Sequence, residues 1–364
     1  MPGQAGTALD LVDPDGRFLG RAIADPKGNP ALRVFSGVEG EAFDAAYLRR
    51  RIQASLAFRH QLGYGPGDGY RLLSGDSEGV PAVTVDSYGG YLVVCAYSDV
   101  VTAFEEPLVA ALADLVHPPA IYVQRRAAPP AAGRPRPGAE LVYGQAASPE
   151  VVLTEGRCRF VVDVSAPASP GLFLDMRRGR EAVSRLAGGR RVLNCFSYTG
   201  AFSVVAAVHG ATAVVSVDSA SRAHGRARRN FDENRIPVEP HEFITGDTFA
   251  VLAQLAERKR VFEMVVIDPP TYSTGKGRAF TALKDYAELV QATLPVLAPG
   301  GFLLACCNAA KLSAAELDRA VGRGASQANR RLVVAERLGL PPDYPVLPAF
   351  TEGDYLKILV ARVE

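Results

Sequence analysis

The segment MVVIDPPTYS combines an apolar run with residues suited to holding a flat substrate. Its four apolar residues, Met264–Ile267, predict a buried strand. Asp268, Pro269 and Pro270 follow, and because proline cannot continue a central strand, the chain must leave the sheet there. Ligands of open α/β sheets bind at the carboxyl ends of the strands. We therefore expect Asp268 and nearby backbone groups to hold the edge of a planar substrate, with Tyr272 stacked on its face.

An upstream segment, GGRRVLNCFSYTGAF, predicts a ligand-binding loop between a strand and a helix. The strand is expected at residues 191–193 and the buried helix at 201–207, and a glycine before the helix permits close backbone approach. The loop lacks GxGxxG and GxxxxGK[ST], which disfavours a pyrophosphate ligand. Its helix N-terminus can instead bind an anion such as an amino-acid carboxylate. The residues expected to line this loop are Asn194, Phe196, Ser197, Tyr198, Thr199 and Gly200.

Two further apolar strands also end in an acid. Asp218, followed by Ser219, ends the first at about the 20-residue spacing at which such an acid binds ribose hydroxyls. Asp247, followed by Thr248, ends the second and is placed to meet an adenine. A lone Asp is more often a helix N-cap, but three polar strand ends in order before Asp268 are less expected by chance. A ligand with a carboxylate, a ribose and an adenine but no phosphate is S-adenosylmethionine, the predicted cofactor.

These motifs resemble those of bacterial large-subunit (23S) ribosomal RNA methyltransferases. NCFSYTGAF, SVDSA and VIDPPTYS are similar to the cofactor motifs of the family, above all in the cytosine carbon-5 enzymes that carry a PUA domain. YRLLSGDSEGVPAVTVDSYGGYLVV, EGRCRFVVDV, PGLFLDMR and DYPVLPAFTEGDYLK extend the resemblance over most of the chain. From PGLFLDMR, the resemblance implies that Phe173, Asp175 and Arg177 also contact the cofactor.

The resemblance and the strand pattern together predict an α/β protein with three domains. Residues 149–364 are expected to form a Rossmann-like class I methyltransferase domain with a mostly parallel, doubly wound sheet. Residues 41–148 predict a central α+β domain that binds RNA or links its neighbours. Residues 1–40 resemble only the latter part of the family's PUA domain, which predicts a truncated β unit.

Composition favours a cytoplasmic enzyme. The chain has 364 residues, of which 48% are hydrophobic and 22% charged, and no apolar run is long enough to predict a membrane-spanning helix. The N-terminal residues lack the pattern of a signal peptide. Five cysteines are scattered without a CxxC motif, which argues against a bound metal and for reduced thiols.

RNA contacts must come from local clusters of basic residues, because the net charge is only +1. Arg50 and Arg51 begin such a cluster on a predicted helix, and Lys276 and Arg278 follow the DPPTYS segment. Solvated surface is the alternative interpretation, and we favour it for the arginines of residues 222–229. The expected partner is 23S ribosomal RNA or a large-subunit assembly intermediate. The sequence leaves a homodimer open.

The methylated atom stays open between two chemistries. Cytosine carbon 5 needs a thiolate that adds to carbon 6. In PGGFLLACCNAAK, however, the position of the family's cysteine falls on Asn308, and Cys306 and Cys307 precede it. A one-residue shift in a strand turns a side chain to the other face, so Cys307 could serve only if the strand end is rearranged, and both cysteines are better explained as buried small residues. An Asn at this position and the DPPTYS segment also resemble relatives that methylate a guanine nitrogen, for which Asp268 could accept a proton.

Several departures from the family's pattern allow other functions. Ser169 and Pro170 stand where Lys-Thr is usual, Met176 where Gln is usual and Tyr344 where His is common. Such losses fit a factor that binds the cofactor and RNA in ribosome assembly with weak catalysis. A methyltransferase acting on a small molecule or a protein side chain is a further alternative.

Overall fold

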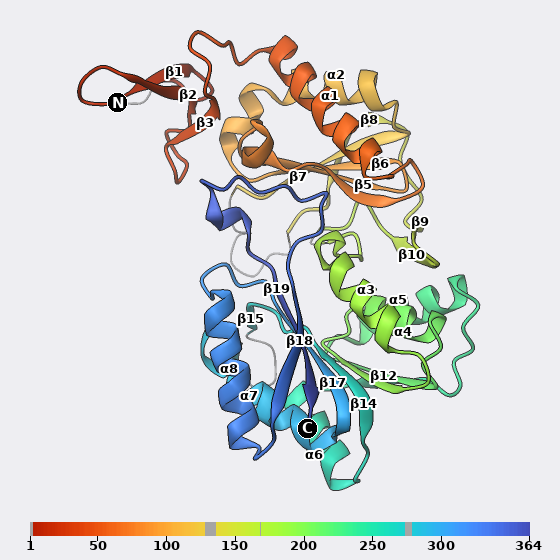
Figure 1. Ribbon diagram of the computed structural model, residues 1–364. Coiled ribbons are helices and arrows are strands. Elements are labelled where there is room, and N and C mark those ends of the chain that lie inside the picture. Colours follow the sequence, from red (N-terminus) through yellow and green to blue (C-terminus); the bar gives the residue numbers. More distant parts are fainter. Residues whose placement is uncertain (1–2, 128–135, 168, 274–278) are drawn as a thin grey trace. The chain divides into compact units, whose positions relative to one another are not determined.

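The computed structural model describes residues 3–127, 136–167, 169–273 and 279–364 (Figure 1). The chain divides into two compact units, and it passes between them after residues 155, 161, 174, 341 and 350. The first unit contains residues 1–155, 162–174 and 342–350, and the second contains 156–161, 175–341 and 351–364. No described helix is long and apolar enough to cross a membrane.

The first unit begins with a three-stranded antiparallel sheet. Its strands are β1 (Ala8–Val12), β2 (Phe18–Ala24) and β3 (Leu32–Ser36). A small β structure was expected in this region from apolar runs broken by Gly and Pro. Its relation to a PUA domain, and the domain boundaries at residues 40 and 148, stay predictions.

The rest of the first unit is built on a five-stranded mixed sheet, covered on one face by two neighbouring helices (Figure 1). The helices bury leucines against valines of the sheet, such as Leu108 and Leu112 with Val85 and Val94. The elements are α1 (Ala45–Gln61), β4 (Gly69–Leu73), β5 (Val83–Tyr88), β6 (Tyr91–Ala96), α2 (Glu105–Val116), β7 (Ala120–Arg125), β8 (Glu140–Gly144) and β9 (Val151–Glu155), with short 3₁₀ helices at η1 (Gly75–Glu78) and η2 (Asp99–Ala103).

A buried polar cluster holds residues 342–350 in the first unit. The guanidinium group of Arg59 is fully buried and donates to both carboxylate oxygens of Glu78 and to the carbonyl of Asp343 (2.9 Å). The carboxylate of Asp343 accepts from the backbone N–H of Arg71 (2.9 Å) and the hydroxyl of Tyr64 (3.1 Å). The bonds to Asp343 connect distant parts of the chain, because this residue follows Arg59, Tyr64 and Arg71 by 284, 279 and 272 residues.

The second unit contains a seven-stranded sheet in the order β13-β12-β11-β14-β17-β19-β18. Neighbouring strands are parallel from β13 to β17, and β19 runs antiparallel to both of its neighbours. The strands are β11 (Arg191–Cys195), β12 (Ala213–Asp218), β13 (Glu242–Thr245), β14 (Phe262–Ile267), β17 (Leu297–Cys307), β18 (Leu332–Leu338) and β19 (Lys357–Val363). This arrangement confirms the predicted Rossmann-like, mostly parallel sheet.

Helices cover both faces of this sheet, with α3, α4 and α5 on one side and α6, α7 and α8 on the other (Figure 1). They are α3 (Arg177–Leu186), α4 (Ala201–Val208), α5 (Ser221–Glu233), α6 (Thr248–Glu257), α7 (Ala282–Thr293) and α8 (Ala314–Gln327). The remaining elements are β10 (Cys158–Val162), β15 (Tyr272–Ser273), β16 (Phe280–Thr281) and the 3₁₀ helices η3 (Leu174–Met176), η4 (Leu294–Val296) and η5 (Thr351–Gly353).

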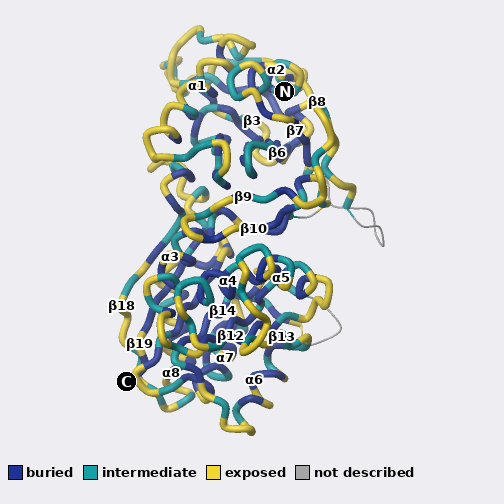
Figure 2. The backbone as a smooth tube through the Cα atoms, turned by 90° about the vertical axis from the view of Figure 1, so that its right-hand side faces the viewer, coloured by how far each residue is buried: buried dark blue, intermediate teal, exposed yellow. Residues whose placement is uncertain are grey.

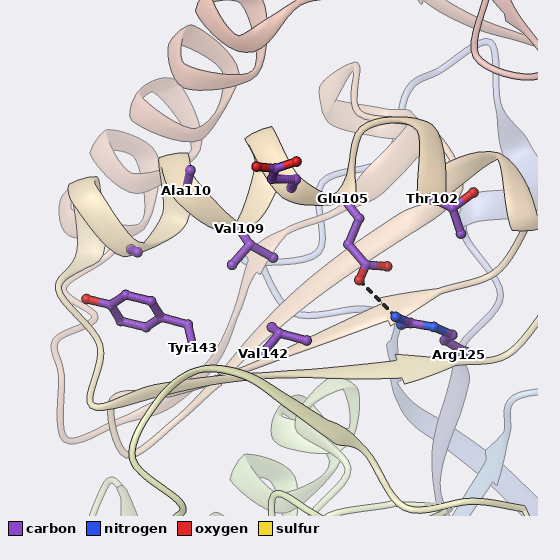
Figure 3. Close-up of a pocket in the computed structure, with 9 residues that line it drawn as sticks. Thr102, Glu105, Val109, Ala110, Arg125, Val142 and Tyr143 are labelled. Atoms are coloured by element: carbon purple, nitrogen blue, oxygen red, sulfur yellow. Dashed lines mark hydrogen bonds and ion pairs between the residues drawn. The ribbon is translucent and has the colours of Figure 1, made fainter.

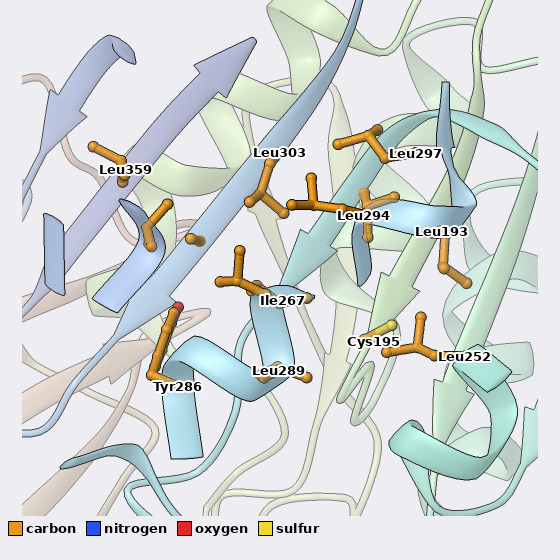
Figure 4. Close-up of a cluster of buried hydrophobic side chains, with 14 of the residues drawn as sticks. Leu193, Cys195, Leu252, Ile267, Tyr286, Leu289, Leu294, Leu297, Leu303 and Leu359 are labelled. Atoms are coloured by element: carbon orange, nitrogen blue, oxygen red, sulfur yellow. The ribbon is translucent and has the colours of Figure 1, made fainter. Parts of the chain in front are cut away.

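Alternate strand residues fill the core between the sheet and α6, α7 and α8 (Figure 4). Leu193, Ile267 and Leu303 come from three adjacent strands, and they meet Leu289 of α7 and Leu252 of α6. Because the parallel strands are buried on both faces, their sequences are continuously apolar rather than alternating. Buried residues accordingly concentrate along the strands in Figure 2, while most connecting segments are exposed or intermediate.

The strand order reverses between β11 and β14. From β11 the chain adds β12 and then β13 on one side, whereas β14 and β17 lie on the other. In doubly wound sheets the crevice beyond the carboxyl ends of the strands at such a reversal binds the ligand. Here that point is occupied by the loop after Cys195 and by Asp268, which are the segments that sequence analysis selected.

Candidate active site

The loop between β11 and α4 turns sharply at the strand ends. Phe196, Tyr198 and Gly200 all have positive φ angles, of 59°, 47° and 76°. Gly200 is required sterically as well, because a Cβ there would lie 3.0 Å from the Cβ of Ala227 on α5. The backbone N–H of Ser197 donates to the carbonyl of Val217 at 2.9 Å, which fixes the loop to the end of β12.

Asp218 lies at the end of β12 with its carboxylate held by backbone groups. Oδ2 accepts from the N–H of Tyr198 and Oδ1 from the N–H of Ala220, both at 2.8 Å. A carboxylate oxygen has two lone pairs, so each oxygen keeps one acceptor position. The side chain is partly exposed, and it can therefore accept hydrogen bonds from the hydroxyls of a ribose.

Asn194 has a buried oxygen without a protein donor. Its Nδ2 donates to Oγ of Ser203 at 2.9 Å, and Ser203 lies 2.8 Å from the hydroxyl of Ser216. Oδ1 has no hydrogen-bond partner among the described residues. An unpaired buried acceptor costs about 1–3 kcal/mol, which a ligand ammonium group could offset. This is the feature at the end of β11 that most directly suits an amino-acid moiety.

Asp247, between β13 and α6, has a structural role and is also a candidate cofactor-binding residue. Asp247 caps α6, because its carboxylate accepts from the N–H of Ala250 at 3.1 Å. The alternative interpretation of this acid as an N-cap is therefore realised, and its contact with adenine stays a prediction. His224 of α5, which sequence analysis did not select, links this region to the loop after β11. Its Nδ1 lies 3.0 Å from Oγ1 of Thr245, and burial lowers its pKa.

Asp268 is partly buried at the end of β14 and has an unusual acidity. Burial and, to a smaller extent, the negative charge of Asp175 raise its pKa to about 7, while the positive charge of Arg180 opposes this rise. Asp175 itself accepts a hydrogen bond from the hydroxyl of Tyr355 at 2.8 Å. Perturbed acids in a crevice are typical of functional sites, and this one can exchange a proton near neutral pH.

The DPPTYS segment is held as a short ribbon. Residues of β15 pair with β16, with Tyr272 opposite Thr281, so the segment does not depend on its prolines alone. Pro269 is buried, whereas the side chain of Tyr272 is 62% exposed and available for stacking. The hydroxyl of Thr271 donates to Oδ1 of Asn308 at 2.7 Å. The ends of β14 and β17 are thereby connected at the candidate substrate site.

The two cysteines of β17 are buried, unlike Asn308. Cys306 is 0% and Cys307 1% exposed, and burial raises the pKa of both thiols. Cys307 belongs to the core formed with α7 and α8. The carbonyl after Asn308, that of Ala309, accepts from Nζ of Lys357 at 2.7 Å. Lys357 is a second residue that sequence analysis missed, and burial lowers its pKa.

Four further predicted site residues lie in the described parts of the chain. Phe173 belongs to the first unit and is 50% exposed, and Arg177 is buried at the start of α3. Arg50 pairs with Glu41 at 3.0 Å, and Arg51 donates to the carbonyl of Glu78 at 2.6 Å. Both arginines thus have structural partners, although contact with RNA stays a prediction for them. Lys276 and Arg278 lie outside the described residues.

An open pocket of about 630 Å³ lies elsewhere, in the first unit, between α2, β7 and β8 (Figure 3). An ion pair between Glu105 and Arg125, at 2.9 Å, spans one end, and Val109, Val142 and Tyr143 line the rest. It contains none of the predicted site residues. The described residues also contain no group of three or more His, Cys, Asp or Glu side chains that could hold a metal ion.

Comparison with known proteins identifies the family of the chain. Residues 75–361 match the family model described as S-adenosylmethionine-dependent methyltransferase. The chain belongs to this family. A ribosomal RNA large subunit methyltransferase I of Klebsiella pneumoniae is 32% identical over 370 residues, which cover 100% of this chain and 92% of the relative. Family membership confirms S-adenosylmethionine as the cofactor and the chain as a methyltransferase.

Solved structures agree with the fold and the ligand class. The methyltransferase SMU.776, crystallised as a complex with SAH, has a TM-score of 0.89 and 26% identity, and the match covers 98% of this chain and 91% of that one. A SAM-dependent methyltransferase from Streptococcus mutans has a TM-score of 0.87 and 25% identity over the same shares of the two chains. Methyltransferases with lower identity support the fold alone.

The residues of the second unit fit the methyl donor, which would supply a methyl group on a positively charged sulfur. The unpaired Oδ1 of Asn194 suits its ammonium group. Asp218 retains acceptor positions for the ribose. The absence of a phosphate-binding glycine motif, noted in the sequence, agrees with a ligand that has no phosphate.

Proposed function

We propose that this methyltransferase modifies a base of large-subunit ribosomal RNA. Two observations support the proposal. The relatives that match the full chain at 32% identity are named ribosomal RNA large subunit methyltransferase I. The exposed ring of Tyr272, four residues after Asp268, is suited to a flat base, and stacking on an aromatic ring contributes about 1–3 kcal/mol per base.

The proposed roles of the site residues follow the strand order. Asn194, Phe196, Ser197, Tyr198, Thr199 and Gly200 cradle the cofactor, together with Asp175, Asp218, Ser219, Asp247 and Thr248. Asp268, Pro269, Pro270, Tyr272 and Asn308 hold the target base, and Phe173 and Arg177 complete the cofactor site. Holding the base and donor in contact lowers the entropic cost of reaching the transition state, which can supply much of the rate.

The first unit is proposed to bind RNA. Arg50 has the more exposed guanidinium group of the two predicted contacts, with 57% of its side chain accessible, so a phosphate can compete with Glu41 for it. Arg51, Lys276 and Arg278 are proposed as further contacts. We propose the cytoplasm as its location, and assembly intermediates as well as naked 23S RNA as its partners.

The proposal is tested with the full chain, S-adenosylmethionine carrying a labelled methyl group, and large-subunit RNA as naked 23S RNA or as subunits extracted from cells lacking the enzyme. We expect label in RNA, and loss of that label in the Tyr272→Ala variant at unchanged affinity for SAH. Leu283→Ala provides a control, since Leu283 is also exposed (53%) and lies on α7. Cofactor binding without labelled RNA would favour an assembly factor. Label in protein or small molecules would favour a methyltransferase that acts on a small molecule or a protein side chain.

A further inference from the structure

Every cysteine of this chain is buried. The five thiols, at positions 95, 158, 195, 306 and 307, are at most 6% exposed, and all lie in the described residues. This matters for the choice of methylated atom, because carbon 5 of cytosine becomes nucleophilic only after an enzyme thiolate has added to carbon 6. The thiolate must touch the base to do so.

The two cysteines that precede Asn308 are the last residues of β17, which lies between β14 and β19 in the sheet. Cys306 and Cys307 pair with Ile358 and Lys357 of β19. Tyr286 of α7 also donates to the carbonyl of Cys306 at 2.7 Å. Moving either sulfur to a base at the strand end would therefore require part of the β17–β19 ladder to open, and each lost buried hydrogen bond is costly. Burial also keeps both thiols protonated at neutral pH.

The exposed position at the end of β17 belongs to Asn308. Its Oδ1 accepts from Thr271, and Lys357 holds the next carbonyl through a hydrogen bond of 2.7 Å. With Oδ1 engaged, the amide presents its Nδ2 hydrogens as donors. An amide cannot replace a thiolate as the nucleophile, but it can donate to an acceptor on the edge of a base.

We propose that the enzyme transfers the methyl group directly to a nitrogen atom of the target base, with no covalent bond between enzyme and base, and that Asn308 recognises an acceptor on that base. This inference rests on the proposed function and specifies its substrate atom. A base nitrogen carries a lone pair, so it needs no prior activation by a nucleophile. Thr271 is a positioning residue that orients the amide.

The step balances without any further reactant. The nitrogen lone pair forms the new N–C bond, while the S–C bond of the donor breaks and its electron pair stays on sulfur. If the nitrogen carries a hydrogen, the proton passes to the carboxylate of Asp268. If it carries none, the base keeps the positive charge, and the same carboxylate stabilises it. The identity of the product distinguishes these two cases.

The decisive experiment analyses the product. RNA methylated by the full-length enzyme is digested to nucleosides and examined by mass spectrometry, and a parallel reaction uses RNA with 5-fluorocytidine, which traps enzymes that attack carbon 6. We expect an N-methylated nucleoside and no protein–RNA adduct on a denaturing gel. Formation of 5-methylcytidine, a 2′-O-methyl nucleoside or a trapped adduct would overturn the inference while leaving RNA methylation intact. Absence of label in any RNA would instead overturn the proposed function.

The role of Asn308 is tested through Thr271. Thr271→Val removes the hydroxyl at nearly constant volume, and Thr271→Ser retains it. We expect Thr271→Val to raise KM for RNA about tenfold or to lower discrimination between target and altered bases, at unchanged SAH affinity and melting temperature, and Thr271→Ser to restore normal values. Equal kinetics for the Val variant and the wild type would show that the hydroxyl does not position the amide.

Discussion

The hydroxyl of Tyr355 donates to Oδ2 of Asp175 at 2.8 Å, and the charge of Asp175 contributes to the raised pKa of Asp268. Two acids and a phenol from three distant parts of the chain are thus connected at one strand end. Burial is the main cause of the raised pKa. The contribution of Asp175, however, can be removed by a substitution that leaves Asp268 in place. This makes the acidity of the site open to experiment.

The rate of methyl transfer should depend on pH with a midpoint near the pKa of Asp268. That pKa is about 7, so we expect single-turnover rates to rise as pH increases through neutrality and Asp268 ionises. Asp175→Asn removes a neighbouring negative charge and should move the midpoint to lower pH. Asp318→Asn, which breaks a surface pair with Arg337, serves as the control and should leave it unchanged. An identical midpoint in all three proteins would exclude Asp268 as the titrating group.

The free energy of unfolding should also depend on pH through Asp268, and the raised pKa of this residue fixes the direction of the change. The folded-state pKa is raised from an ordinary value of 3.8, so the protonated form contributes stability that is complete below about pH 4 and is lost as pH rises through about 7. Asp268→Asn has no such dependence. We therefore expect its free energy of unfolding, relative to wild type, to increase by up to about 4 kcal/mol between these pH values in urea titrations. A constant difference would refute the assigned shift.

Gly200→Ala should weaken both folding and cofactor binding. The substitution places a side chain at φ = 76° and 3.0 Å from the Cβ of Ala227. Gly156→Ala is a matched control, because its φ is 58° but nothing lies within 4 Å of the added atom. We expect the control to cost about 1–2 kcal/mol for backbone strain alone, and Gly200→Ala to cost more and to reduce SAH affinity in calorimetry. Equal costs and unchanged affinity would argue against close packing at this turn.

Replacing Asp218 and Asp247 by Asn, one at a time, distinguishes a role in cofactor binding from a role in helix capping. Asp218→Asn places amide hydrogens against the N–H groups of Tyr198 or Ala220 and should weaken SAH binding by about 1–3 kcal/mol. Asn caps helices as well as Asp does, so Asp247→Asn should keep α6 stable. A loss of affinity in the second variant would therefore report contact with the ligand, whereas an unchanged value would leave Asp247 with its capping role alone.

The buried pair of the first unit should be sensitive to loss of one partner. Arg59→Met leaves the carboxylate of Glu78 buried without its cation, which typically costs about 3–5 kcal/mol. Arg125→Met breaks a pair in which the arginine is 46% exposed, and such pairs contribute about 0–1 kcal/mol. Urea unfolding of both variants measures the difference. Similar midpoints would show that water reaches Glu78.

Sequence reasoning located the strand ends but not the contacts among them. Apolar runs followed by an acid or prolines placed Asp218 and Asp268 correctly at the ends of β12 and β14, because both signals are local. The offset of Cys307 from the family's cysteine correctly predicted that the strand could bury it. Thr271 and Asn308 are 37 residues apart, and Asp175 and Tyr355 are 180 apart. No local pattern specifies such pairs, so Tyr355, Lys357 and His224 were missed.

The return of residues 342–350 to the first unit has a practical consequence for anyone dividing this protein. A fragment beginning near residue 149 would retain Asp343 yet lack Arg59, Tyr64 and Arg71, the groups that bind it. No single cut therefore yields an intact catalytic half. A fusion protein that contains only one of the two units would have to keep residues 342–350 together with the first unit.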